Sequence, residues 1–169
     1  MSYRNKTYVA FASEDILNYR MMEAWKSNKK IDFDFYDAHD LFVSRDTSSR
    51  ETIKRNLRER LKNAKQVVLL GTEDCKKKGG DGVSFLAHEI EVIMEYKLPI
   101  VIVNINQSRV VERTLIPNLL LNASYYTVSV SYQAAIIQYA LDNYAVTFGS
   151  SDKKGPHQYP SETYTKLGL

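Results

Sequence analysis

The sequence has little of what marks several classes of protein. Cys75 is its single cysteine, which excludes an internal disulfide and a cysteine-based metal cluster. Its three histidines, His39, His88 and His157, lie far apart and show no zinc-type spacing. No apolar run is long enough to span a membrane, and the first residues lack the apolar core of a signal peptide. We therefore expect a cytoplasmic protein that binds no metal and no membrane.

Two common enzyme signatures are also missing. No Gly-x-Gly-x-x-Gly motif follows the first apolar run, and the glycines of Gly79–Gly82 stand in a later loop. No Gly-x-Ser-x-Gly elbow of a serine hydrolase occurs. The net charge of +3 is weak and predicts neither nucleic acid nor an anionic membrane as a partner.

What the sequence does contain is the composition of one ordinary globular domain. Its 169 residues suffice for a real core, and 44% hydrophobic with 25% charged residues is typical of folded proteins. We expect residues 1–149 to form this domain. Residues 150–169 are polar with Gly155, Pro156 and Pro160, so we expect a poorly ordered C-terminal tail or a segment that packs against a partner.

Strand and helix patterns alternate five times along the chain. The predicted strands are Thr7–Ala12, Ile31–Tyr36, Gln66–Gly71, Ile100–Ile105 and Ser124–Val130. The predicted helices are Ile16–Lys26, Ser49–Ala64, one that begins after Ser84, a short irregular one within Arg109–Leu121, and Tyr132–Tyr144. This alternation predicts an α/β three-layer sandwich of flavodoxin-like type, with a five-stranded parallel sheet in the order 2-1-3-4-5.

The stretch Ser84–Ile105 combines an amphipathic helix, a break at Pro99 and a strand that is apolar on both faces. Glu89 falls in the middle of the apolar side of this helix, whereas Glu91 and Glu95 fall opposite, where we expect solvated carboxylates. A buried carboxylate is costly unless it is paired, neutralised or lines a cavity. Glu89 therefore either serves a site or simply favours the positive end of its helix.

Ligands of such sheets bind outside the carboxyl ends of the strands, here between the first and third strands. The segments that converge there are Phe11–Glu14, the loops Asp37–Arg50 and Thr72–Gly82, and the start of the Glu89 helix. The candidate substrate-binding residues in these segments are Phe11, Ala12, Ser13, His39, Asp40, Arg45 and Phe85. Ser13 is also a plausible helix cap. Phe11 and Phe85 either line the pocket or pack in the core, and His88 is expected at the surface.

The helix that follows Ser49 has a narrow apolar stripe and a basic face. The basic residues are Lys54, Arg55, Arg58, Arg60 and Lys62. Such a face is usually solvated, and it lacks the interleaved aromatics that would strengthen a nucleic-acid hypothesis.

Four motifs together resemble a TIR domain, in particular the TIR-like proteins of bacterial Thoeris-type antiphage systems. They are the strand VAFASED, the segment FYDAHD, the strand VVLLG and the stretch SFLAHEIEVIMEYKLPIVIVNI. The resemblance runs from about Thr7 to Tyr144. Phe85 and Glu89 occupy the aromatic and glutamate positions of the most specific motif. Around Ala10 the usual serine is replaced, Phe85 replaces a tryptophan, and the long loop lacks the proline-glycine of many members.

The resemblance implies an enzyme for which NAD is a substrate and which needs no cofactor. In enzymatic members the glutamate cleaves the nicotinamide–ribose bond of NAD, and several bacterial members cyclise the remaining ADP-ribose into a signal for an effector protein. It thus implies that Glu89 is catalytic and that an effector is an indirect partner; self-association into a homo-oligomer stays open. The alternative is a non-catalytic TIR adaptor that works by self-association, but the position of Glu89 in an apolar stripe favours the enzyme.

Overall fold

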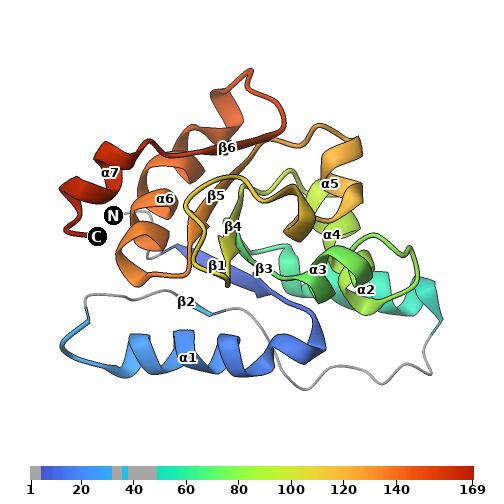
Figure 1. Cartoon of the computed structure of the whole chain (residues 1–169). Coiled ribbons are helices and arrows are strands. Elements are labelled where there is room, and N and C mark those ends of the chain that lie inside the picture. Colours follow the sequence, from blue (N-terminus) through green and yellow to red (C-terminus); the bar gives the residue numbers. More distant parts are fainter. Residues whose placement is uncertain (1–4, 32–35, 38–48) are drawn as a thin grey trace.

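The computed structural model of the chain describes residues 5–31, 36–37 and 49–169, and its centre is a six-stranded parallel sheet (Figure 1). The strand order is β2-β1-β3-β4-β5-β6. The strands are β1 (Lys6–Ala10), β2 (Tyr36–Asp37), β3 (Gln66–Gly71), β4 (Ile100–Asn104), β5 (Thr127–Ser131) and β6 (Pro156–Gln158). The predicted parallel sheet and its order 2-1-3-4-5 are confirmed for the first five strands. β6 is an addition that the sequence analysis did not predict.

The middle strands are apolar on both faces because both faces are covered. Every residue of β3, β4 and β5 is buried. β3 pairs with β4 in the register Val67↔Ile100 and Leu69↔Ile102. Alternate residues of each strand enter two separate apolar clusters, one on each side of the sheet. The result is the predicted three-layer sandwich.

The helices divide between these two faces. On one face the apolar cluster includes residues of α1 (Ile16–Ser27), α6 (Ala134–Thr147) and α7 (Ser161–Lys166). On the other face it includes residues of α2 (Arg50–Leu61), α3 (Glu73–Lys78), α4 (Phe85–Glu95) and α5 (Asn118–Asn122). Three short 3₁₀ turns complete the described part: η2 (Ser13–Asp15), η3 (Arg113–Leu115) and η4 (Phe148–Ser150). We call the side that carries α2 to α5 the α4 face.

The predicted loop Thr72–Gly82 contains a helix, so that prediction is wrong. Thr72 caps α3, since its hydroxyl accepts a hydrogen bond from the backbone N–H of Cys75 at 3.0 Å. Acidic residues occupy the first turn of α3 and lysines its last turn, which suits the helix dipole. The signal was therefore in the sequence, but the helix is only six residues long.

The C-terminal segment packs on the core, which corrects the prediction of a poorly ordered tail. β6 pairs with β5 in the register Val128↔His157. Tyr164 of α7 is fully buried, and its hydroxyl accepts a hydrogen bond from the backbone N–H of Ser131 at 3.2 Å. The guanidinium of Arg109 lies 4.6 Å from the centre of the same ring.

The predicted second strand, Ile31–Tyr36, and the predicted loop, Asp37–Arg50, are described only in part. β2 lies at the edge of the sheet, as the acidic alternation of that strand predicts, and pairs with β1 in the register Lys6↔Tyr36. Residues 32–35 and 38–48 lie outside the described residues. The candidate residues His39, Asp40 and Arg45 fall in that gap and stay predictions.

Candidate active site

Helix α4 places Glu89 against the sheet. Asp81 fixes the start of the helix, because its Oδ1 accepts hydrogen bonds from the backbone N–H groups of Val83 at 2.9 Å and Ser84 at 2.7 Å. The seven residues of α4 that are buried include Glu89, which is 1% exposed. The prediction that Glu89 lies on the buried side of its helix is therefore confirmed.

The partner of Glu89 is a tyrosine on the neighbouring strand. The hydroxyl of Tyr8, in β1, donates a hydrogen bond to Oε1 of Glu89, and Tyr8 is fully buried. Burial raises the pKa of Glu89 to about 8, against the lowering effects of the Tyr8 hydrogen bond and the Arg60 charge. A buried carboxyl with a strongly raised pKa is a candidate functional group.

The alternation of β1 decides which of its residues lie on the same side as Glu89. Tyr8, Ala10 and Ala12 belong to the cluster on the α4 face. Phe11 belongs to the opposite cluster, where its ring stacks on Tyr19 with centroids 4.9 Å apart. The core alternative for Phe11 thus agrees with the structure, and the hypothesis that Phe11 lines a pocket with Glu89 has no support from its placement. A strict two-residue period along Tyr8–Ala12 would have shown this from sequence.

Polar residues gather where β1 and β3 end, at the edge where the sequence places the crevice. Asp15 is buried, and its Oδ2 accepts a hydrogen bond from the Thr72 hydroxyl at 2.6 Å. Burial raises the pKa of Asp15 even though Thr72 opposes the shift. Burial, and then the charges of Asp15 and Glu89, raise the pKa of the Cys75 thiol. Cys75 therefore lies near enough to both carboxyls for their charges to act on it.

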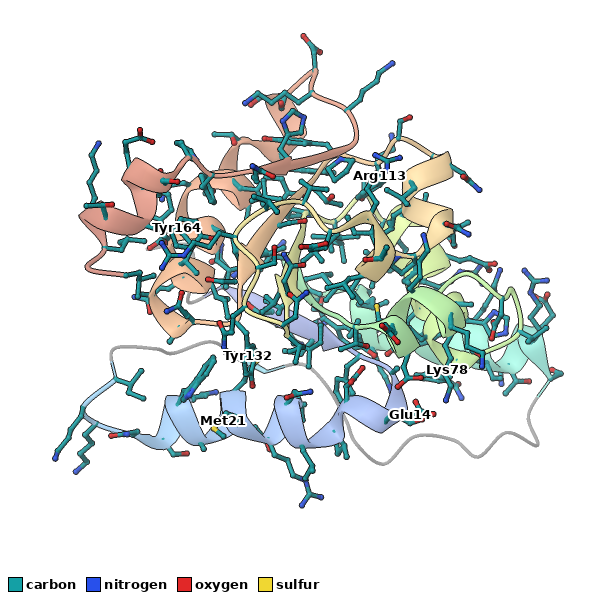
Figure 2. All side chains as sticks on the ribbon, viewed as in Figure 1. Glu14, Met21, Lys78, Arg113, Tyr132 and Tyr164 are labelled. Atoms are coloured by element: carbon teal, nitrogen blue, oxygen red, sulfur yellow. The ribbon has the colours of Figure 1, made fainter. Side chains whose placement is uncertain are left out.

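Lys78, at the end of α3, contacts the residues that follow β1 at this edge. Its Nζ forms an ion pair with Glu14 (Figure 2). The same Nζ donates a hydrogen bond to the hydroxyl of Ser13 at 3.3 Å. Ser13 is exposed, and its hydroxyl donates to the Glu14 carboxylate at 3.2 Å. Ser13 makes no helix-capping hydrogen bond, so its prediction as a cap is wrong. Its prediction as a substrate contact is untested.

The other described candidates lie on the α4 face. Ala12 is buried there, and Phe85 is half-buried and packs against the same cluster. Phe85 and Glu89 are four residues apart on α4 and so share one side of the helix. The structure thus brings Ala12, Phe85 and Glu89 to one face of the sheet, with Asp15 and Thr72 at its edge. Sequence reasoning missed Tyr8, Asp15 and Thr72.

Two glutamates that follow Glu89 on α4, Glu91 and Glu95, contact the basic helix α2. His88 is 3% exposed, which corrects the expectation of a surface residue, and its Nδ1 lies 3.9 Å from the Glu91 carboxylate. Glu91 pairs with Arg50 at 3.2 Å and with Lys54. Glu95 pairs with Arg58 at 3.1 Å. The two carboxylates predicted to be solvated therefore form ion pairs with α2.

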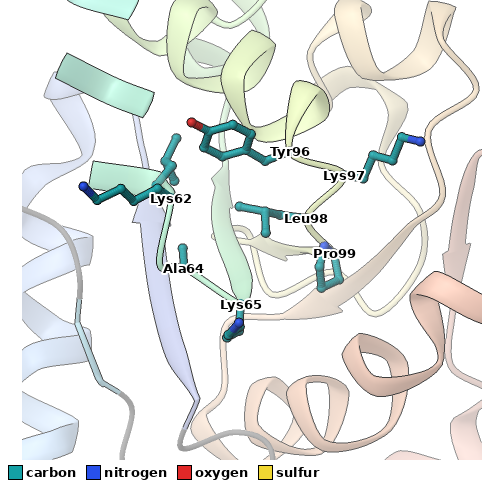
Figure 3. Close-up of a pocket in the computed structure, with 8 residues that line it drawn as sticks. Lys62, Ala64, Lys65, Tyr96, Lys97, Leu98 and Pro99 are labelled. Atoms are coloured by element: carbon teal, nitrogen blue, oxygen red, sulfur yellow. The ribbon is translucent and has the colours of Figure 1, made fainter. Parts of the chain in front are cut away.

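A shallow hollow of about 500 Å³ lies at the other edge of the sheet, next to the starts of β3 and β4 (Figure 3). Its lining residues are Leu61, Lys62, Ala64, Lys65, Tyr96, Lys97, Leu98 and Pro99. None of the candidate residues that the structure describes lines it. Within the described ranges, no cluster of acidic, histidine or cysteine side chains has a metal-binding arrangement. No helix of the same ranges is long and apolar enough to cross a membrane.

Comparison with known proteins now decides the family. The family described as "Thoeris protein ThsB, TIR-like domain" matches residues 8–110, which contain the end of β1 and the whole of β3, α4 and β4. The chain belongs to this family. As a TIR-like Thoeris protein, it has a role in antiphage defence. No curated protein sequence matches the chain.

Proposed function

We propose that this TIR-like Thoeris protein is an NAD-consuming enzyme in which Glu89 is the catalytic residue. The observation that carries the proposal is the Glu89 carboxyl, buried on the α4 face and held by a phenol, with a polar edge beside it. The reaction breaks the bond between nicotinamide and C1′ of the ribose. Nicotinamide leaves as a neutral base with the bonding electron pair, and C1′ becomes an oxocarbenium-like cation. Water, or a nucleophile within the ADP-ribose itself, then captures C1′ and loses a proton.

This chemistry needs few groups, and one deeply buried carboxylate such as that of Glu89 can meet its main requirement. Nicotinamide is cationic in NAD, so it departs without a general acid. The transition state gains positive charge on the ribose, and a fixed carboxylate stabilises that charge most strongly where water is excluded. The ribose hydroxyls offer hydrogen-bond donors by which the same carboxylate orients the sugar.

The raised pKa of Glu89 predicts how the rate depends on pH. With a pKa of about 8, the carboxyl of the free protein holds its proton at neutral pH. Only the ionised form stabilises a cation, so kcat/KM should rise as the pH increases toward about 8. A bound nicotinamide cation favours ionisation, because an opposite charge lowers the pKa of a carboxyl. The acid limb of kcat should therefore lie at lower pH than the limb of kcat/KM.

We further propose that the remaining ADP-ribose is closed into a cyclic signal that activates an effector protein in the cytoplasm. Membership in a Thoeris family supports a signalling product. Incubation of the purified protein with NAD, followed by mass spectrometry, tests both steps. Release of nicotinamide supports cleavage, and a product lighter than ADP-ribose by one water supports cyclisation. Linear ADP-ribose alone would contradict the cyclic signal but not the cleavage.

A non-catalytic adaptor remains the second candidate, because a buried carboxyl bonded to a tyrosine can also be a structural pair. The two functions differ in what Glu89→Gln does. In the enzyme this change lowers the rate of NAD cleavage by about 10²–10³ and leaves the fold at least as stable. In an adaptor it weakens the Tyr8 pair and no NAD is consumed in any variant. Nucleic acid has little support as a partner, since Lys54 and Arg58 of the basic helix pair with carboxylates of α4.

A further inference from the structure

Tyr8 is held on both sides by the sheet and is covered from solvent. It lies in β1, between two neighbouring strands, and its Cα is paired in register with Val67 of β3. Its side chain is 0% exposed and belongs to the apolar cluster on the α4 face. The hydroxyl therefore approaches Glu89 from a fixed point on the sheet and not from a mobile loop.

We propose that Tyr8 is a positioning residue of the NAD-cleaving site, whose hydroxyl holds one oxygen of the Glu89 carboxyl so that the other faces the ribose. The inference rests on the proposed function and deepens it. In the part of the chain that the structure describes, Tyr8 is the residue that hydrogen-bonds the Glu89 carboxyl, and it does so through Oε1. This contact defines the rotation of the carboxyl about its last bond, which burial alone does not.

A phenol suits this task better than a cation would. Lys or Arg in its place would neutralise the negative charge on which the transition state depends. A phenol is a neutral donor, so it orients the carboxylate and leaves its full charge for the substrate. The hydrogen bond also favours the ionised form and limits how far burial raises the pKa. The other titratable groups that act near Glu89 are Arg60 on α2 and the Cys75 thiol on α3.

The test is Tyr8→Phe, which keeps the ring and removes only the hydroxyl. We expect kcat to fall by about 10- to 100-fold with KM little changed, as is typical when an orienting partner is lost. The acid limb of kcat/KM should also move to higher pH, because the ionised carboxylate loses a donor. Tyr125→Phe is the matched control. Tyr125 packs against the same cluster, and its hydroxyl donates to the Leu98 carbonyl at 2.8 Å, away from Glu89.

Carboxyl carbon NMR gives a second readout that does not depend on turnover. The Glu89 resonance, assigned by its loss in Glu89→Gln, should titrate at higher pH in Tyr8→Phe than in the parent and in Tyr125→Phe. Suppose that the titration of Glu89 and the acid limb of kcat/KM are the same in Tyr8→Phe as in the parent, and that Tyr8→Phe and Tyr125→Phe lose similar stability. Tyr8 is then structural, and the inference is overturned. If the titration moves but the parent never cleaves NAD, the proposed function fails although the Tyr8–Glu89 contact is real. That result also overturns the positioning role.

Discussion

Glu89 couples the stability of the protein to pH. The pKa of its carboxyl is about 8 in the folded protein, because it is buried, and near 4.5 in the unfolded chain. Below pH 4.5 both states hold the proton, and the burial has no ionic cost. Between pH 4.5 and about pH 8, the unfolded chain releases the proton of Glu89 and the folded protein keeps it. The free energy of unfolding therefore falls as the pH rises through this range.

Glu89→Gln should remove this dependence. At pH 5 we expect the variant and the parent to unfold at similar temperatures. At pH 8 the variant should be more stable, by an amount on the order of a few kcal/mol, since each pKa unit corresponds to about 1.4 kcal/mol. Thermal unfolding of both proteins across pH 5–8 measures the difference. If the difference in melting temperature between variant and parent does not grow with pH, Glu89 is not a buried carboxyl that keeps its proton in the folded protein.

Cys75 should be chemically inert in the folded protein. Burial raises the pKa of its thiol to about 12, and its side chain is 0% exposed. The three lysines that follow it in sequence therefore do not activate it. A thiol reagent at pH 8 should label the native protein far more slowly than the unfolded chain, and Cys75→Ser should keep NAD turnover. Rapid labelling of the native protein, or loss of turnover with the fold intact, would contradict this.

Sequence alone predicted the burial of Glu89 but not its partner. The helical wheel places Glu89 correctly because a regular helix fixes the direction of each side chain. Tyr8 was missed because its contact joins two segments 81 residues apart. His88 was wrongly assigned to the surface, since the apolar side of α4 is wider than one stripe. Residues of α4 pack against strand residues in one apolar cluster, and α2 lies against the same helix.

At the scale of elements, α2 and α4 are joined by ion pairs between facing helices. Arg50 and Lys54 both contact the Glu91 carboxylate, whose side chain is 24% exposed. Partial burial disfavours the charge of Glu91, but the hydrogen bonds from Lys54 and Arg50 outweigh it and hold its pKa below the usual range. The basic face of α2 thus has a structural role in addition to its contact with solvent.

Glu91→Gln should weaken this contact modestly without affecting catalysis. Partly exposed ion pairs contribute about 0.2–1 kcal/mol each, and salt screens them. We expect a loss of about 1 kcal/mol in the free energy of unfolding, smaller in high salt, with NAD turnover unchanged. Urea unfolding at low and high ionic strength measures it. A loss that is equally large in high salt would show that packing, and not charge, is what the variant disturbs.

At the scale of the whole molecule, the C-terminal segment completes one side of the fold. Its residues Tyr159, Leu167 and Leu169 pack against the cluster between the sheet and α6, around the buried Tyr164. Gly155, with a φ of +70°, provides the turn that leads into β6. The polar composition of residues 150–169 hid this, because a few well-placed aromatic and aliphatic residues are enough to anchor a short segment. The order of the other five strands was predictable, since strand–helix alternation leaves few topologies.

Tyr164→Ala should therefore be strongly destabilising. Removing a large buried aromatic side chain costs about 3–5 kcal/mol, which corresponds to a drop on the order of 10 °C in Tm for a chain of this length. Lys166→Ala, an exposed change in the same helix, is the control and should alter Tm little. Differential scanning calorimetry compares the two. Equal melting temperatures for parent and Tyr164→Ala would show that α7 does not stabilise the core.

The most direct test of the central claim is NAD cleavage by the parent, Glu89→Gln and Glu95→Gln, measured together with their melting temperatures. Glu95 lies on the same helix, pairs with Arg58 and has a 48% exposed side chain, so its change controls for the loss of a charge on α4. Under conditions in which the parent is active, Glu89→Gln should lose about 10²–10³ in rate while melting at the same or a higher temperature. Glu95→Gln should keep the parent rate. Turnover by Glu89→Gln equal to that of Glu95→Gln would contradict a catalytic role for Glu89.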